Sequence, residues 1–472
     1  MDIISRWAGQ RLLFVALVAV AVVAFPVGTV GVIGLVVLLV VGSRKPKLLS
    51  PLVALAGMFF IRPNVWGEEY SNVGLMLFLL ATGIAFIQDR GQFLYAEREY
   101  RPVRSPLFWV SLAYLWLLLR ASYHGLDTVG QSMSGYVATA ACVLAVVVIV
   151  GDKARRGYLV KGFVAVVFAV SLSYVCTVGL WAVMGIGTGS VGTMIIGAWP
   201  TPQPIYFPFT TTVSTQPILG FVVPRFVGFG REPGWMAMYG CVAYFLLPLI
   251  GWRSKIVKLG ILAGVLGTVS TAGFGVLAFC LAVDFTVNGR SRTSFEGAMR
   301  ICFGLAMIAF AIWAAVYAPV LGFGAKGEQN GISLSERSIA TDMGFWALQN
   351  DPFSGGLAAD KVGAVNLVAA IAAYGLPFSV LMGLSTIAPL RRHPHGRRLL
   401  PVLAALALTL LTSQPALDSA WVFALAALGT AAALDPAEIP QKEPLLAAKK
   451  SNVPDHYKRL AEQRARAAAT NC

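Results

Sequence analysis

The chain has 472 residues, of which 57% are hydrophobic and only 12% are charged, and its formal net charge is +15. This composition and a mean hydropathy of +0.72 exclude an ordinary soluble globular protein and predict a polytopic membrane protein. A nucleic-acid-binding role is also excluded, because the basic residues are not gathered in one soluble segment.

The basic residues instead lie in short clusters between apolar segments, such as Arg44–Lys47 and Arg391–Arg398. Under the positive-inside rule these clusters face the cytoplasm, whereas Arg225, Arg231 and Arg337 face outward. Because a transmembrane helix needs about twenty residues, the apolar segments account for about fourteen helices, several of them short. The predicted fold is therefore an all-α polytopic bundle with both termini in the cytoplasm and two large outer loops.

In chain order the sequence divides into six expected segments. The first of them begins with two short helices within Leu12–Gly42. The six segments are N-terminal transmembrane helices at 1–186, an outer loop at 187–233, central transmembrane helices at 234–323, a second outer loop with a short helix at 324–362, C-terminal transmembrane helices at 363–434 and a basic cytoplasmic tail at 435–472.

The first outer loop, 187–233, is rich in proline, threonine and aromatic residues and includes the run WPTPQPIYFPFTTTVSTQP. It shows no helical period. We therefore expect an irregular loop or a short pair of strands.

Two of the later apolar runs are predicted to be hairpins, because a chain that returns to the same side must cross the membrane an even number of times. One hairpin bends at Ser270–Gly273, and the other occupies Leu399–Leu434 and bends at Thr412–Pro415. A single span is expected to lead from the second outer loop to Arg391.

The second outer loop contains a predicted helix. The sequence SLSE beginning at Ser333 has the spacing of a capping box, which marks a helix start. Ile339, Met343 and Trp346 recur at helical spacing and form the expected apolar face. Asn350–Pro352 ends the helix, because proline disfavours helical geometry in the residue before it.

Reactive groups are expected at the outer face. The centres of the predicted spans are almost empty of ionisable residues, which ion-coupled transporters need at mid-membrane. Three of the four histidines, His393, His395 and His456, fall on the cytoplasmic side, so no outer metal site is predicted. Arg337, in the first helical turn, is disfavoured by the helix dipole and is either an anion ligand or a solvated charge. Polar residues concentrate in the two outer loops, which favours a membrane enzyme.

A family resemblance is carried by the C-terminal half of the chain. Arg225–Tyr239, RFVGFGREPGWMAMY, resembles the arginine-then-glutamate-proline motif of exopolysaccharide polymerases. Arg337–Gly356, with its tryptophan, Asp-Pro and Gly-Gly pairs, resembles the signature of the O-antigen ligase and Wzy polymerase superfamily. The segment Asn366–Pro377 and the Ser270–Gly273 turn are also similar to parts of that family. The combination is more specific than any one motif.

The resemblance implies a bacterial inner-membrane glycosyltransferase whose two outer loops are periplasmic, the second being catalytic. It implies an undecaprenyl diphosphate-linked oligosaccharide as donor, transfer to a sugar hydroxyl, no metal or other cofactor, and the lipid bilayer and other polysaccharide assembly proteins as partners. Arginines would bind the departing diphosphate, and a carboxylate would accept the hydroxyl proton. The residues expected to act are Arg225, Arg231 and Arg337 for the diphosphate, Arg337 also in catalysis, Glu232 as base with Asp342 or Asp360 as substitutes, and Trp235, Trp346, Asp360 and Asn366 for the glycan.

Several alternatives stay open. Glu232 could form an ordinary ion pair with Arg231, and both tryptophans could anchor the chain at the membrane interface. Ligases of this superfamily often carry a histidine directly before the asparagine that is Asn366 here, and this chain has Val365. That difference favours a repeat-unit polymerase over a ligase that uses a lipid or protein acceptor. From a different class, an exporter or flippase of the lipid-linked glycan would need a charged central cavity.

Overall fold

The structure is a computed structural model. It describes residues 45–60, 71–89, 101–124, 126–196, 201–218, 221–289, 293–317, 331–353, 367–392, 396–412 and 420–434. The predicted hairpin within Leu12–Gly42 and the predicted tail at 435–472 lie outside these residues.

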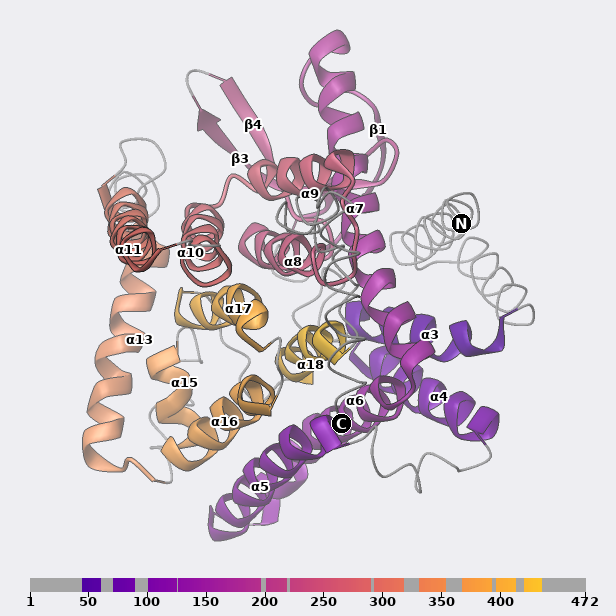
Figure 1. Cartoon of the computed structure of the whole chain (residues 1–472), viewed down its shortest axis with the longest axis vertical. Coiled ribbons are helices and arrows are strands. Elements are labelled where there is room, and N and C mark those ends of the chain that lie inside the picture. Colours follow the sequence, from indigo (N-terminus) through magenta and orange to yellow (C-terminus); the bar gives the residue numbers. More distant parts are fainter. Residues whose placement is uncertain are drawn as a thin grey trace, which may run out of the picture. The chain divides into compact units, whose positions relative to one another are not determined.

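The chain is mostly helical, as predicted, and its order is shown in Figure 1. The helices are α3 (Pro46–Phe60), α4 (Ser71–Asp89), α5 (Arg101–His124), α6 (Leu126–Gly151), α7 (Lys153–Met184), α8 (Pro233–Leu246), α9 (Lys255–Gly267), α10 (Thr271–Asn288), α11 (Ser294–Tyr317), α13 (Gly331–Asn350), α15 (Leu367–Tyr374), α16 (Leu376–Arg392), the 3-10 helix η3 (Gly396–Leu399), α17 (Leu400–Thr412) and α18 (Ala420–Leu434).

Two of the described helices, α7 and α10, are long and apolar enough to cross a membrane. The pair α15 and α16 would make a third candidate span if it forms one bent crossing, and shorter apolar helices lie among the others. The described part of the chain therefore has the character of a helical membrane protein. The count of about fourteen spans stays a prediction.

The prediction of an all-α fold is wrong for the segment after α7. This segment forms a four-stranded antiparallel sheet in the order β1 (Ser190–Met194), β2 (Gln203–Tyr206), β3 (Thr210–Ile218), β4 (Phe221–Phe226). We predicted an irregular loop or a short pair of strands here, and the segment is more regular than that. The threonines of β3 have a high β propensity, and β3 pairs with β2 through its first two residues and with β4 through the rest of its length.

Helix α8 lies at the centre of the helical core. It packs against α7, α9, α10 and α17, and Figure 1 shows it between α9 and α17. Its residues are apolar on all sides and almost all buried, as expected for an internal helix. Small residues allow this close packing: a Cβ at Gly240 would collide with Val265 of α9, and one at Gly273 would collide with Ala237.

A cluster of hydroxyl groups fixes the sheet to α7. Thr177 Oγ1 lies 2.7 Å from Thr210 Oγ1 and donates to the Phe207 carbonyl at 2.8 Å. Ser173 Oγ lies 2.9 Å from Thr210 Oγ1 and accepts from the Phe209 N–H at 3.2 Å. Ser173, Thr177 and Thr210 are all buried, so these bonds are shielded from water and hold β3 in one place.

The predicted bend at Ser270–Gly273 is confirmed, because α9 ends at Gly267 and Ser270 is the N-cap of α10. The end of α17 at Thr412 also agrees with the predicted turn. The single span expected before Arg391 is interrupted at Gly375, and whether it is one bent crossing stays a prediction. Helices α15 and α16 meet at an angle of 114°.

Candidate functional site

Three of the predicted site residues lie around the turn between β4 and α8. Arg225 is in β4, where it pairs with Val213 of β3, and Glu232 is the N-cap of α8 with Arg231 directly before it. The strand is fixed by the hydroxyl cluster through β3, and the helix is fixed by the core. The turn is therefore held at both ends.

Two glycines fold this turn against the first turn of α8. Gly228 has a φ of +55°, which favours glycine, and a Cβ there would lie 2.5 Å from Met236 Sδ. A Cβ at Gly230 would lie 2.8 Å from Trp235 Cβ. Thr211 Oγ1 donates to the Gly228 carbonyl at 2.8 Å. Larger residues at either glycine would push the turn away from α8.

The Glu232 carboxylate makes no capping hydrogen bond at the start of α8. Its backbone is extended, with φ −139° and ψ 157°, and Pro233 follows at the first helical position, where its missing N–H is not needed. Within the described residues no ion pair joins Glu232 to Arg231 or Arg225. The ion pair with Arg231 that is the alternative role of Glu232 is therefore not formed in this structure.

Arg225 and Arg231 are half-buried, and the Nε atom of each is buried without a hydrogen-bond partner among the described residues. Burial lowers the pKa of Arg225, and the negative charge of Glu232 opposes that shift. An arginine with a lowered pKa remains charged at neutral pH, because its ordinary value is far above it. A buried unpaired donor is unfavourable, so an anion bound here would be stabilised.

The N-terminus of α10 lies beside the N-terminus of α8. A Cβ at Gly234 would lie 3.6 Å from Ser270 Oγ, and Ser270 Oγ accepts from the Gly273 N–H at 3.3 Å. Val269, just before this cap, has a φ of +46°, which is strained for a β-branched residue. Two neighbouring helix N-termini add partial positive charge to that of the arginines. This region is thus suited to a negatively charged ligand.

The second predicted segment forms α13, which begins at Gly331 rather than at Ser333 and ends at Asn350 as predicted. Ile339, Met343 and Trp346 share one side of this helix as predicted, but that apolar face is not the packed one, because Ile339 and Trp346 are 54% and 57% exposed. The buried face consists of the small residues Ala340, Gly344 and Ala347.

Close helix packing explains why small residues form the buried face of α13. A Cβ at Gly344 would lie 3.0 Å from the backbone N of Ala369 in α15, so a larger residue would require the two helices to move apart by a few tenths of an ångström. Asp342 and Trp346 are both exposed, and their spacing places them one turn apart on one face of the helix. A carboxylate and an aromatic ring are therefore available together on α13.

In the described part of the chain, α13 has no extensive contact with β4 or α8, the two elements that flank the turn with Glu232. Arg337 lies in α13, but only its backbone is described. Among the described elements, α13 packs on α15, α15 also contacts α17, and α17 packs on α8. The two predicted site segments are thus linked through two helices, and Asp360 and Asn366 lie outside the described residues.

The chain after α13 is joined to the break between α15 and α16. The Leu376 N–H donates to the Pro352 carbonyl at 3.0 Å. Gly375 has a φ of +84°, and a Cβ there would collide with the Phe353 carbonyl. Two parts of the family resemblance, the Asp-Pro pair and the Gly-Leu-Pro sequence, therefore meet in space.

Trp235 is only 1% exposed. It packs in the core around α8, which does not fit the prediction that its ring stacks on a sugar or anchors at the interface. Trp346, in contrast, is exposed and remains available for either role.

Sequence reasoning missed the residues that position Arg225, chiefly Ser173, Thr177 and Thr210. The threonine run in TTTVST is typical of a strand and could have predicted β3. The matching hydroxyls on α7 gave no signal, because serine and threonine at helical spacing are common in membrane helices.

Within the described ranges, no group of three or more His, Cys, Asp or Glu residues is placed to hold a metal ion. Comparison of the chain with protein-family models, with curated proteins and with solved structures finds no significant match.

Proposed function

We propose that the protein is a bacterial inner-membrane glycosyltransferase that polymerises repeat units of a surface polysaccharide. Its donor would be an undecaprenyl diphosphate-linked oligosaccharide, and its acceptor a sugar hydroxyl. The observation that carries this proposal is the pair of half-buried arginines, with Nε donors unpaired in the described part, beside the uncapped Glu232 carboxylate.

The membrane location is supported by the apolar surface of the described helices. Large apolar side chains stay exposed on α4 and α11, including Met76 at 69%, Ile87 at 76%, Phe295 at 74% and Phe310 at 66%. Such surfaces are unfavourable in water and ordinary against lipid. We place about fourteen spans in the bilayer, with the sheet and α13 on the periplasmic side.

The proposed reaction balances without a redox partner. The acceptor oxygen attacks the anomeric carbon of the donor, the bond from that carbon to the diphosphate oxygen breaks, and the diphosphate leaves with the bonding electrons. Glu232 accepts the hydroxyl proton. Arg225 and Arg231 stabilise the charge that develops on the diphosphate, and the two helix N-termini add to this effect.

The α13 segment would complete the site by holding the glycan. Trp346 offers an exposed ring for the apolar face of a sugar, and Asp342, one turn before it, offers a hydrogen-bond acceptor for hydroxyls. In this proposal Arg337 gives a third positive charge, and Asp360 and Asn366 contact the glycan. Asp342 and Asp360 also remain the candidate bases behind Glu232.

A reconstituted assay tests this function. Purified protein in proteoliposomes is given undecaprenyl diphosphate-linked oligosaccharide extracted from the bacterial host, and released undecaprenyl diphosphate and glycan length are both measured. We expect Glu232→Gln to lower the transfer rate by about 100-fold or more, because a general base is lost. The matched control is Glu296→Gln, which changes an exposed carboxylate on α11 and should leave the rate unchanged.

The products of the same assay separate the alternatives. Long glycans support a polymerase. A single transfer to an added lipid or protein acceptor without elongation would indicate a ligase, and movement of intact lipid-linked glycan without release of undecaprenyl diphosphate would indicate an exporter or flippase. Either result would overturn the polymerase proposal.

A further inference from the structure

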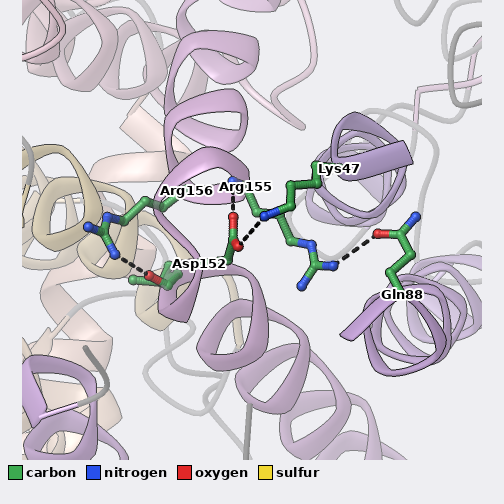
Figure 2. Close-up of polar contacts among 6 residues, drawn as sticks. Lys47, Gln88, Asp152, Arg155 and Arg156 are labelled. Carbon is green, nitrogen blue, oxygen red and sulfur yellow. Dashed lines mark hydrogen bonds and ion pairs between the residues drawn. The ribbon is translucent and has the colours of Figure 1, made fainter. Parts of the chain in front are cut away.

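A separate polar cluster joins the ends of α3, α4 and α7 (Figure 2). Asp152, in the turn between α6 and α7, accepts from the Arg155 backbone N–H at 2.9 Å and from Lys47 Nζ at 3.0 Å. Arg155 Nη2 donates to Gln88 Oε1 of α4 at 3.0 Å. This cluster lies at the start of α7, roughly 35 Å along the helix from Thr177. It is therefore distinct from the candidate glycan site.

The exposed part of this cluster is basic. Arg155 is fully buried, whereas Lys47 and the neighbouring Lys45 and Lys153 are exposed. Lys47 keeps 57% of its side chain exposed although it pairs with Asp152. Its ammonium group has three N–H donors, and Asp152 takes one of them. Lys47 therefore retains donors that an external anion can use.

An apolar stripe runs along α4 to the same corner. Met76, Leu80 and Ile87 are 69%, 50% and 76% exposed, and their spacing keeps them on one side of the helix. Ile87 directly precedes Gln88, which is held by Arg155. Exposed ammonium groups thus lie next to the end of an exposed apolar stripe. A phosphate group attached to acyl chains satisfies both features.

We propose that the corner formed by α3, α4 and α7 binds an anionic phospholipid. Its phosphate contacts Lys45 and Lys47, and its acyl chain lies along the α4 stripe. The hydrogen bonds of Asp152 and Arg155 support this site, because they hold together the helix ends that carry the lysines and the apolar stripe. This inference rests on the membrane location and is independent of glycosyl transfer.

Native mass spectrometry and thermal unfolding of the detergent-solubilised full chain test this site. Phosphatidylglycerol should bind more tightly than phosphatidylcholine and should raise the unfolding temperature. The double variant Lys45→Gln/Lys47→Gln should weaken phosphatidylglycerol binding by about fivefold per lysine, roughly 25-fold in total. Its unfolding temperature in phosphatidylcholine is measured alongside, so that a general loss of stability is distinguished from a loss of lipid binding.

The matched control is Arg253→Gln/Lys255→Gln. It removes two exposed basic residues with the same spacing at the start of another helix, α9. We expect phosphatidylglycerol binding to be retained in this control. An equal loss in both double variants would overturn the proposal, as would equal binding of the two lipids by the unmodified protein. Protection by inorganic phosphate equal to that by phosphatidylglycerol would also overturn it, because the apolar stripe would then play no part.

Discussion

Gly228 shows how one residue sets the position of the charged groups around it. Its backbone is in the left-handed region, and the space where a Cβ would sit is filled by Met236 and Val170. The absence of a side chain at this position lets the turn that carries Arg231 and Glu232 lie against α8 without strain.

We therefore expect Gly228→Ala to destabilise the protein by about 1–3 kcal/mol, through backbone strain and overpacking against Met236. Thermal unfolding in detergent, followed by tryptophan fluorescence, measures the change. Gly83→Ala on α4 is the control, because nothing lies within 4 Å of the added Cβ and alanine favours helix. If the two variants unfold at the same temperature, the close packing of the turn is not present in solution.

The contact between α7 and β3 illustrates how one pair of elements positions the site. Thr177 bonds to both Thr210 and the Phe207 carbonyl, and β3 in turn pairs with the strand that holds Arg225. Hydrogen bonds between buried groups are costly to break when one partner is left unsatisfied.

Thr177→Val keeps the side-chain volume and removes the hydroxyl. We expect a loss of about 1–3 kcal/mol in unfolding free energy, because the buried Thr210 hydroxyl loses a partner. The proposed transfer activity should fall together with the stability, because β3 would no longer be fixed to α7 and would no longer position β4 with Arg225. The comparison is Thr409→Val in α17, where a buried hydroxyl donates to the Ala405 carbonyl of its own helix. If Thr409→Val loses as much unfolding free energy as Thr177→Val, then Thr177 has no special role in holding β3 against α7.

The junction of α3 and α7 makes stability depend on pH. Burial by itself raises the pKa of Asp152, but hydrogen bonds from Arg155 and Lys47, with their positive charges, outweigh this effect and leave the pKa below its usual value. A lowered pKa stabilises the folded state above the usual carboxyl range. That contribution is lost as the pH falls through the folded pKa.

Asp152→Asn retains a residue that can cap α7 and removes the charge. We expect the variant to be less stable than the original protein by up to about 1 kcal/mol from pH 5 to pH 7, and the difference to shrink as the pH falls below about 4 and through the lowered folded-state pKa. Unfolding measured across this pH range provides the check. A difference that is independent of pH would show that the ion pair with Lys47 contributes nothing.

For the whole molecule, the proposed topology places the sheet on one side of the membrane and the corner formed by α3, α4 and α7 on the other side. With native cysteines replaced, Thr193→Cys on β1 should react with an impermeant maleimide in intact cells. Lys255→Cys at the start of α9 should react only after permeabilisation. Labelling of Lys255→Cys in intact cells would place α9 in the opposite orientation.

Part of this architecture was accessible from sequence. Charge clusters and apolar runs predicted the bend at Ser270 and the helix end at Thr412, because these signals are local. The sheet, the break at Gly375 and the buried face of α13 were missed. Each depends on long-range packing, since small residues such as Gly344 are buried only when a second helix approaches them.

The candidate site was predictable to a similar extent. The motif at Arg225–Tyr239 grouped Arg225, Arg231 and Glu232, and the structure places these residues around the turn between β4 and α8. The burial of Trp235 could not be read from the motif, because the sequence does not show that α8 packs among α7, α9, α10 and α17.

In the proposed reaction, Arg225 and Arg231 bind the diphosphate of a polyprenyl-linked donor. Native mass spectrometry with undecaprenyl diphosphate measures this binding directly in the unmodified protein and in Arg225→Lys/Arg231→Lys, with the exposed Arg253→Lys as control. Because lysine keeps the charge but loses the planar fork, the double variant should bind at least about tenfold more weakly, and the control should bind normally. Undiminished binding by the double variant would contradict the account.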